Sequence, residues 1–257
     1  MTWGIFMKKQ SFSVAIGVIA ATSGAYANES DWEGFSLKLG ASASRATNEG
    51  NSSFDTDYEY IGYEGNDFYS DYKDSTTDAR GFVGLGYDTV LANGLVFGVF
   101  GEYNFGDQKT SNYQSGDGIA YDDGYYVKDT TTLKNSLNLG VRLGKLLTED
   151  NDLVYVSGGV ASGEFDQKTL GWDEYNGVGL TASDNSREVG GFIGIGYERN
   201  LMSGFRLSAE YRHTNYSDFN KSRATDDYDP YHNINFAGNE KNDFKTDEFR
   251  LAIIKSF

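Results

Sequence analysis

The sequence predicts an all-β protein: an eight-stranded antiparallel up-and-down transmembrane β-barrel. Three observations lead to this fold class. Eight segments alternate apolar residues with small or charged ones, the connections between them are alternately short and long, and the chain opens with a stretch typical of exported proteins. The length of 257 residues suits one large β structure. We expect residues 28–257 to form a single barrel domain.

The first 27 residues resemble a secretory signal peptide rather than part of the fold. Lys8 and Lys9 give a short basic start, a mostly small and apolar stretch follows, and Ala25 and Ala27 form a small-x-small cleavage site. We therefore expect residues 1–27 to be removed. The alternative is a single membrane-anchor helix, but the apolar stretch is shorter than the ~20 residues that such a helix needs.

Composition excludes several classes of protein. The formal net charge is -16, so a nucleic-acid partner, which needs clustered Lys and Arg, is not expected. The absence of cysteine excludes disulfides and thiolate metal sites. Aromatic residues make up 15% of the chain, which is too much apolar surface for a disordered protein. No cofactor is expected.

Period-two alternation runs through the chain after residue 27 and predicts its strands. In residues 133–144 the apolar and polar side chains separate onto the two faces of a strand, whereas a helix would scatter them. The apolar face of this segment holds Leu133, Leu137, Leu139, Val141 and Leu143. The eight predicted strands are 34–42, 81–88, 95–105, 133–144, 153–165, 188–198, 205–213 and 249–257.

The connections decide between a membrane barrel and a soluble sandwich or lipocalin-like barrel, which share this alternation. Short turns are expected near 92–94, 149–152 and 200–204, and long acidic, Tyr-rich loops at 46–78, 106–130, 166–186 and 217–243. Systematic asymmetry of this kind is typical of membrane barrels, as are aromatic girdles near strand ends. The expected girdle residues are Trp32, Phe35, Tyr87, Tyr103, Phe105, Tyr197, Phe205, Tyr211 and Phe257.

The polar face of each strand would then line the lumen, which in an eight-stranded barrel is just wide enough for side chains. Charges of both signs fall on this face, and buried charges must pair. We expect an interior ion-pair network that plugs the barrel, with slow or gated ion leakage left open. Its expected members are Lys38, Glu102, Lys134, Arg142, Glu188, Glu198, Arg206, Glu210, Arg212, Glu248 and Arg250.

Several stretches resemble the small outer-membrane β-barrel family of Gram-negative bacteria, which includes the OmpA transmembrane domain and opacity-type porin-like surface proteins. They are "GFVGLGYDTVLANGLVFGVFGEYNF", "YVSGGVASGEF", "GGFIGIGYERNL", "RLSAEYRHTNYSDF" and "FRLAIIKSF". The resemblance implies eight strands, both termini in the periplasm and variable loops at the cell surface. It also implies contact with outer-membrane lipid and lipopolysaccharide.

The closing segment resembles the signal that the barrel-assembly machinery reads in this family. Phe249, Leu251, Ile253 and Phe257 match its alternating apolar residues and terminal aromatic. Lys255 departs from it, since an apolar residue is usual there, although a lysine can snorkel to a membrane interface.

The resemblance implies a surface protein with a structural or adhesive role rather than an enzyme, and a low-conductance porin is the alternative. The stretch "YEYIGYEGNDFYSDYKD" favours binding of a host or environmental ligand, because tyrosine gives rigid contact area in recognition loops. The competing interpretation is that the loops merely extend the strands above the membrane. Haem is a candidate ligand by family analogy, but two histidines are thin support.

Catalysis and specific metal binding have weak support. Barrel enzymes that modify lipid A place a serine two residues from a histidine on a strand, and here Asn215 occupies that place after His213. No EF-hand spacing is present, so a solvated acidic surface is the simpler interpretation of the loop acids. These acids are Asp55, Asp57, Glu59, Glu64, Asp67, Asp71, Asp74, Asp226, Asp227 and Asp229.

Overall fold

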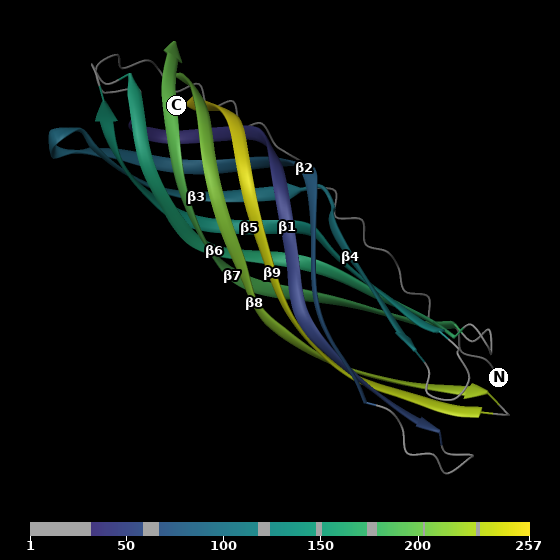
Figure 1. The fold of residues 1–257 in the computed structure, drawn as a ribbon. Helices are drawn as coiled ribbons and strands as arrows, with labels where there is room; N and C mark the ends of the chain where they lie inside the picture. The colour runs from purple at the N-terminus through teal and green to yellow at the C-terminus, as the bar shows by residue number, and fades with distance from the viewer. Residues whose placement is uncertain are drawn as a thin grey trace, which may run out of the picture.

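The computed structural model describes residues 32–58, 67–117, 124–147, 151–173, 179–202, 204–229 and 232–257. Ala25 and Ala27, the expected cleavage site, lie outside these ranges. Within them the chain forms nine strands and one 3-10 turn (Figure 1). The elements are β1 (Gly34–Tyr58), β2 (Asp67–Leu91), η1 (Ala92–Gly94), β3 (Leu95–Phe105), β4 (Gln108–Asp117), β5 (Gly124–Leu147), β6 (Asp152–Asp173), β7 (Gly179–Met202), β8 (Phe205–Asp229) and β9 (His232–Ser256).

The sheet closes into a ring of eight antiparallel barrel strands, which confirms the predicted fold class. Consecutive strands pair with each other except β3 and β4, which both pair with β5; β3 also pairs with β2, and β9 returns to pair with β1. Figure 1 shows β1 (purple) beside β9 (yellow). The third barrel strand is divided into β3 and β4 at Gly106, whose φ of +107° is a conformation that favours glycine.

An apolar belt covers the outside of the ring. Leu39, Leu85, Ile193 and Ile253 are each more than half exposed, although they are large hydrophobic residues. Such a surface would be unfavourable in water and suits a hydrocarbon surrounding. Leu251 and Phe249 continue the belt along β9. The predicted outward faces are thus observed, with one exception.

The exception is Leu133, which was predicted to face outward with Leu137 and is instead fully buried in the barrel. The ladder between β5 and β6 shifts register between Leu133 and Ser136. A β-bulge adds one residue to a strand and so reverses the direction of the side chains beyond it. The sequence pattern of β5 contains no sign of this bulge.

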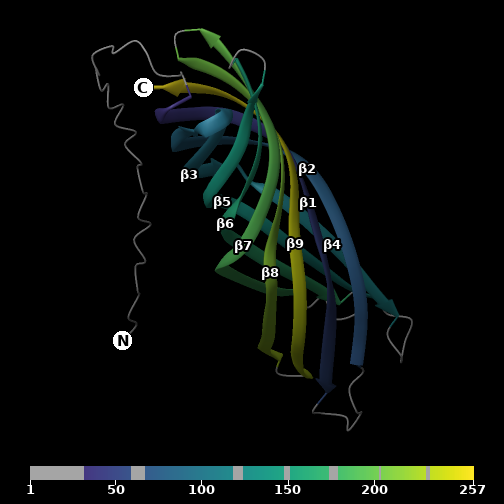
Figure 2. The ribbon, with the colours of Figure 1, turned by 90° about the vertical axis from the view of Figure 1, so that its left-hand side faces the viewer.

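The expected long loops are corrected by the structure: apart from residues 106 and 107, their described parts are strand. Seven of the described strands have 22 to 25 residues, whereas a membrane-spanning strand needs about 9–11. The β1–β2 ladder continues to Asp55 and Asp67, and the β8–β9 ladder to Asp229 and His232. The hairpins therefore form long arms at one end of the barrel, which we call the hairpin end (Figure 2).

Short turns lie at the opposite end, which we call the turn end. Asn93 and Gly94 have φ angles of 65° and 70°, as an Asn-Gly hairpin turn requires, and this confirms the turn predicted at 92–94. Phe257, beyond β9, donates its backbone N–H to the carbonyl of Phe35 at 2.9 Å. In the described ranges no helix is long and apolar enough to cross a membrane.

Lys255 lies at the turn end on the outward face of β9. It pairs across the ladder with Phe205, and its ammonium lies 4.5 Å from the centre of that ring. A cation over an aromatic face is stabilised by the ring quadrupole. This contact accommodates the lysine where an apolar residue was expected.

Two adjacent glycines on β7 test the closeness of strand packing. A Cβ on Gly190 would come within 2.2 Å of the Asn215 carbonyl oxygen, whereas on Gly191 the nearest heavy atom lies at 3.8 Å. We expect Gly190→Ala to lower the free energy of unfolding by about 1–3 kcal/mol, because backbone must shift. Gly191→Ala, the matched control, should have little effect. Urea unfolding in lipid vesicles measures the free energy of unfolding of both variants. Equal losses in the two would contradict the close approach of the backbone at Gly190.

Candidate functional site

The centre of the lumen is an ion-pair cluster around Glu102 on β3. Arg212 of β8 lies 2.6 Å from its carboxylate, Arg250 of β9 at 2.8 Å and Lys38 of β1 at 3.4 Å. Arg212 also binds Glu210 at 2.9 Å. Four strands thus meet through one carboxylate, and the surrounding wall excludes water, so each charge depends on its partners.

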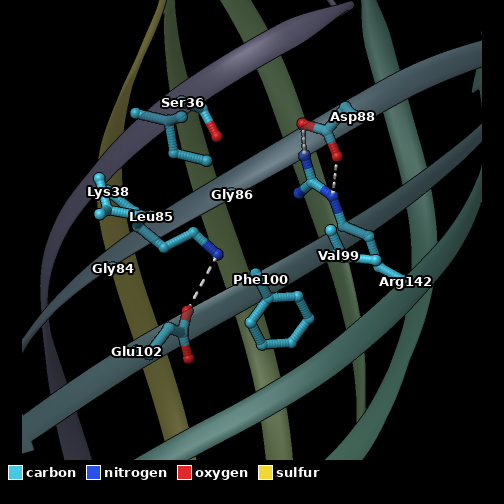
Figure 3. A pocket seen from close by; sticks show the side chains of 11 residues that line it. Ser36, Lys38, Gly84, Leu85, Gly86, Asp88, Val99, Phe100, Glu102 and Arg142 are labelled. Carbon is cyan, nitrogen blue, oxygen red and sulfur yellow. Dashed lines mark hydrogen bonds and ion pairs between the residues drawn. The ribbon is translucent and has the colours of Figure 1, made fainter.

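A second cluster lies toward the turn end, around Asp88 on β2. Arg142 of β5 donates two hydrogen bonds to Asp88, at 2.8 and 2.5 Å, and a third to Glu198 of β7. Arg206 of β8 lies 3.5 Å from Asp88 and 3.4 Å from Glu198. Figure 3 shows the paired side chains of Arg142 and Asp88 beside those of Lys38 and Glu102.

A third link joins Arg80 on β2 to Glu248 on β9, at 3.6 Å. Glu248 lies equally close to Arg250 and so connects this pair to the central cluster. Sequence reasoning missed Arg80 and Asp88. Both share the inward parity of Gly84 and Gly86. Asp88 is the last residue of the predicted strand 81–88 and Arg80 directly precedes that strand, so the alternation would have found Asp88 as it stands and Arg80 after extension by one residue.

Two of the eleven expected lumen charges lie outside these clusters. Lys134 is not in the lumen network: it sits in the bulge of β5 and pairs with Asp166 at 3.0 Å, away from the inward face of β6. The bulge that turns Leu133 inward is the physical reason. Glu188 has the inward parity of Glu198 but is half-buried nearer the hairpin end. The structure brings the other nine together.

Apolar layers close the lumen on both sides of the charges. Trp32, which was expected in the outer girdle, is instead 1% exposed and lies under Arg206, 4.8 Å from its guanidinium. Trp32 precedes β1, so its side chain does not have to follow the inward and outward alternation of that strand. Its indole ring can therefore fold over the lumen. The turn-end cluster comprises Trp32, Val96, Leu146, Leu153 and Tyr155.

The hairpin-end aromatic cluster lies beyond Glu102. Phe165 contacts Tyr216 and Phe244 edge-to-face, at ring distances of 5.2 and 5.1 Å. Phe192 receives the Arg212 guanidinium at 4.5 Å, which joins this layer to the charges. Its buried members are Ala46, Leu133, Ala161, Phe165, Phe192, Tyr216 and Phe244.

A small cavity remains between Lys38, Glu102, Asp88 and Arg142, with Phe100 on its wall (Figure 3). Its volume is about 20 Å³, room for about one water molecule. The described part of the lumen is therefore filled by side chains at this level rather than open to solutes.

The outer surface becomes charged directly above the apolar belt. Glu49 on β1 binds Lys245 at 2.7 Å and Lys73 at 2.9 Å, and Lys245 also binds Asp243 at 2.6 Å. Hydrogen bonds from Lys245 and then Lys73 lower the pKa of Glu49 to about 2. Hydrogen bonds to Asp243 and Glu49 raise the pKa of Lys245 above its usual value.

His213 belongs to this outer rim. Its Nδ1 lies 2.9 Å from an Asp247 oxygen that also accepts a hydrogen bond from Tyr211 at 2.6 Å. The neighbouring Thr214 is buried on the opposite, inward face, and Asn215 is exposed. The arrangement orients the imidazole but sets no hydroxyl nucleophile against it among these residues.

The structure describes only some of the loop acids, including Asp71 and Asp74. The side chains of Asp55, Asp57, Asp67, Asp226, Asp227 and Asp229, and all of Glu59 and Glu64, lie outside the described set. Among the residues that are described, no group of three or more His, Cys, Asp or Glu side chains could hold a metal ion.

The sequence model of one family, described as "Outer membrane protein beta-barrel domain", matches residues 12–239. No curated protein matches the chain. Solved structures similar to it include Neisserial surface protein A, with 13% identity over 88% of this chain and 98% of that one, at a TM-score of 0.34. OmpT, an outer membrane protease from Escherichia coli, has 6% sequence identity over 90% of this chain and 99% of its own, at a TM-score of 0.49. Ail, an attachment invasion locus protein of Yersinia pestis, has 11% sequence identity over 82% of this chain and 98% of its own, at a TM-score of 0.28.

The central cluster makes a quantitative prediction. Arg212→Met removes the nearest cation from both Glu210 and Glu102 and leaves these two buried carboxylates to share Arg250, which lies 3.7 Å from Glu210 and 2.8 Å from Glu102. We therefore expect a loss of about 3–5 kcal/mol in the free energy of unfolding. Arg199→Met is the matched control, because Arg199 is 61% exposed and 3.8 Å from Asp152, and should cost under about 1 kcal/mol. Urea titration of both variants measures this, and a similar loss in each would show that the interior pairs contribute no more than the surface pair.

The outer rim makes a prediction for pH. The pKa of Glu49 is lowered from 4.5 to about 2, so its stabilisation is present above pH 4.5 and lost as the pH falls through about 2. Glu49→Gln should therefore accelerate amide exchange of β1 and β9 at pH 7 but not near pH 2. The effect should stay below about 1 kcal/mol, since exposed ion pairs are screened. A constant difference at all pH values would contradict it.

Proposed function

Because the chain belongs to the outer membrane protein beta-barrel domain family, we propose that it is a surface protein of the bacterial outer membrane that contacts partners outside the cell through its hairpin arms. In this proposal the short turns and both termini face the periplasm and the arms face outward. The barrel serves as a closed anchor, and its role is structural and adhesive rather than catalytic. The observation that carries the proposal is a filled lumen beneath arms that extend far beyond the belt.

The filled lumen supports an anchor over a porin. Buried ion pairs occupy its centre, apolar layers lie on both sides, and the described cavity among them is about 20 Å³. A conducting pore needs a continuous water-filled path, and moving an ion through this interior would break buried pairs at a cost of several kcal/mol each.

The arms support a binding role. Their strands continue for more than ten residues past the length that a bilayer requires, so the ladders keep their surfaces rigid. A rigid surface loses less entropy on binding than a flexible loop does. The sequence that the β1–β2 arm carries is rich in tyrosine and acids, which suits contacts with polar or cationic partners.

Two lipid contacts belong to the same proposal. The apolar belt would face acyl chains, and the rim that contains Lys73, Lys245 and Glu49 would lie at the level of lipopolysaccharide headgroups. Phe249, Leu251 and Ile253 face outward on β9 with Phe257 beyond them, where the barrel-assembly machinery would read them.

Shortening one arm tests the proposal. Residues 52–70 are replaced by an Asn-Gly turn between Asn51 and Asp71, which are ladder partners, so the barrel is untouched. We expect bacteria displaying this variant to adhere at least about tenfold less to epithelial monolayers, a loss of about 1.4 kcal/mol in binding. The control shortens the β6–β7 arm between Thr169 and Ala182 in the same way.

Planar-bilayer recordings of the wild-type protein and both variants complete the test. All three should remain closed, and a gel shift between unheated and boiled samples reports folding. Unchanged adhesion after both deletions would remove the binding role, whereas stepwise conductance of the wild-type protein would favour the low-conductance porin.

A further inference from the structure

The wall of the barrel contains a seam at the hairpin end. The ladder between β2 and β3 stops at Gly81 and Phe105, and in the described ranges β4 pairs with β5 only. The β1–β2 ladder nevertheless continues to Asp67. Beyond Gly81, the β1–β2 and β4–β5 hairpins therefore lie next to each other without a described ladder between β2 and β4.

Side chains close this seam in place of a ladder. Asp74 accepts the backbone N–H of Ser111 at 2.8 Å, and Asp78 accepts that of Lys109 at 3.4 Å. Arg80 donates to the carbonyl of Gly106 at 3.0 Å. Three side chains of β2 thus hold β4 and Gly106, which lies two residues before it.

Two further bonds cross the lumen behind the seam. Gln108 of β4 donates to the Ser44 hydroxyl of β1 at 2.8 Å, and Asn48 of β1 donates to the Thr131 hydroxyl of β5 at 3.3 Å. Side chains of β1 thus reach β4 and β5 across the lumen, and the described hydrogen bonds between β2 and β4 come from side chains of β2. Such links separate more easily than a continuous ladder, because each can exchange its partner for water.

Behind the seam lies a layer of uncharged amides, which we call the amide layer: Asn48, Gln108, Gln167 and Asn242. All four are at least 95% buried, and six of their amide atoms have no hydrogen-bond partner among the described residues. They are Asn48 Oδ1, Gln108 Oε1, both amide atoms of Gln167 and both of Asn242. A buried polar atom without a partner is costly, so this layer favours a species that supplies donors and acceptors.

The layer sits directly above the hairpin-end aromatic cluster. Phe244 pairs with Asn48 across the ladder, and Phe165 precedes Gln167 by two residues on the same inward face. One row farther out, Asp129 accepts a hydrogen bond from Thr169 at 2.5 Å. The layer thus combines neutral amides with an aromatic floor.

We propose that the seam is a gate and that the amide layer behind it binds a small uncharged sugar or polyol. Hydroxyl groups donate and accept, as the unsatisfied amides require, and the C–H faces of a sugar pack on aromatic rings. The aromatic cluster and the ion pairs close the lumen below, so this solute binds and returns by the same path. The site is independent of the adhesive role of the arms.

A disulfide across the seam tests the gate, because the chain has no cysteine of its own. Asp74→Cys with Ser111→Cys joins the two hairpins where a side chain already reaches the opposite backbone. The matched control is Ala43→Cys with Ala79→Cys, ladder partners within the β1–β2 hairpin that leave the seam free. The probe is trehalose, titrated into each protein in detergent micelles while the side-chain amide resonances of Gln167 and Asn242 are followed by NMR.

We expect saturable shifts in the wild-type protein, in the reduced seam pair and in the control pair in either redox state. Oxidation of the seam pair should weaken apparent binding at least about tenfold. Equal binding by the oxidised and reduced seam pair would overturn the gate, and no saturable shift in the wild-type protein would overturn the site.

If the cysteine pair disturbs folding, a second variant still tests whether the amide layer binds the sugar. Asn242→Leu keeps the side-chain size and removes two unsatisfied amide atoms at a distance from the seam residues on β2. It should abolish the trehalose response while its unheated and boiled forms still differ on a gel. Trehalose binding at the wild-type level would contradict a role for this layer.

Discussion

Closure of the backbone hydrogen-bond ring is the constraint on which the rest of this structure depends. A strand edge in hydrocarbon would leave N–H and C=O groups without partners, so β9 must return to β1. Closure with eight strands sets an interior only wide enough for side chains. Period-two alternation then sends one face of every strand into that interior and the other into lipid.

The interior follows from this narrow space. Charged side chains on the inward face have no access to bulk water within the belt, so Glu102, Asp88 and their arginines must satisfy one another. Aromatic rings cover the guanidinium groups of Arg206 and Arg212, which joins the charged and apolar layers into one packed unit. Inward glycines provide the room: a Cβ on Gly140 would meet the rings of Phe192 and Phe100 at 2.7 and 2.8 Å.

The same constraint explains where the backbone ladder between β2 and β3 ends. Within the belt every barrel strand has two ladder partners, but the β2–β3 ladder ends at Gly81 and Phe105, and Phe105 is among the last residues of the exposed apolar surface on that strand. Beyond the belt, water and polar side chains can satisfy backbone groups, so Asp74, Asp78 and Arg80 can replace a ladder there. A gate in the wall is therefore compatible with a sealed membrane segment.

The sequence alone determined the fold class, the outward faces of the strands and the Asn93–Gly94 turn, because alternation and turn geometry depend on neighbours one or two residues apart. Only the tertiary structure decided which charges meet, since Glu102 contacts Arg212 through the stagger of strands far apart in the chain. It also decided that Leu133 turns inward and Lys134 leaves the lumen at a bulge, and that Trp32 covers the lumen. The long arms were missed as strands because regular alternation of hydrophobic residues fades in their sequences, although backbone pairing continues.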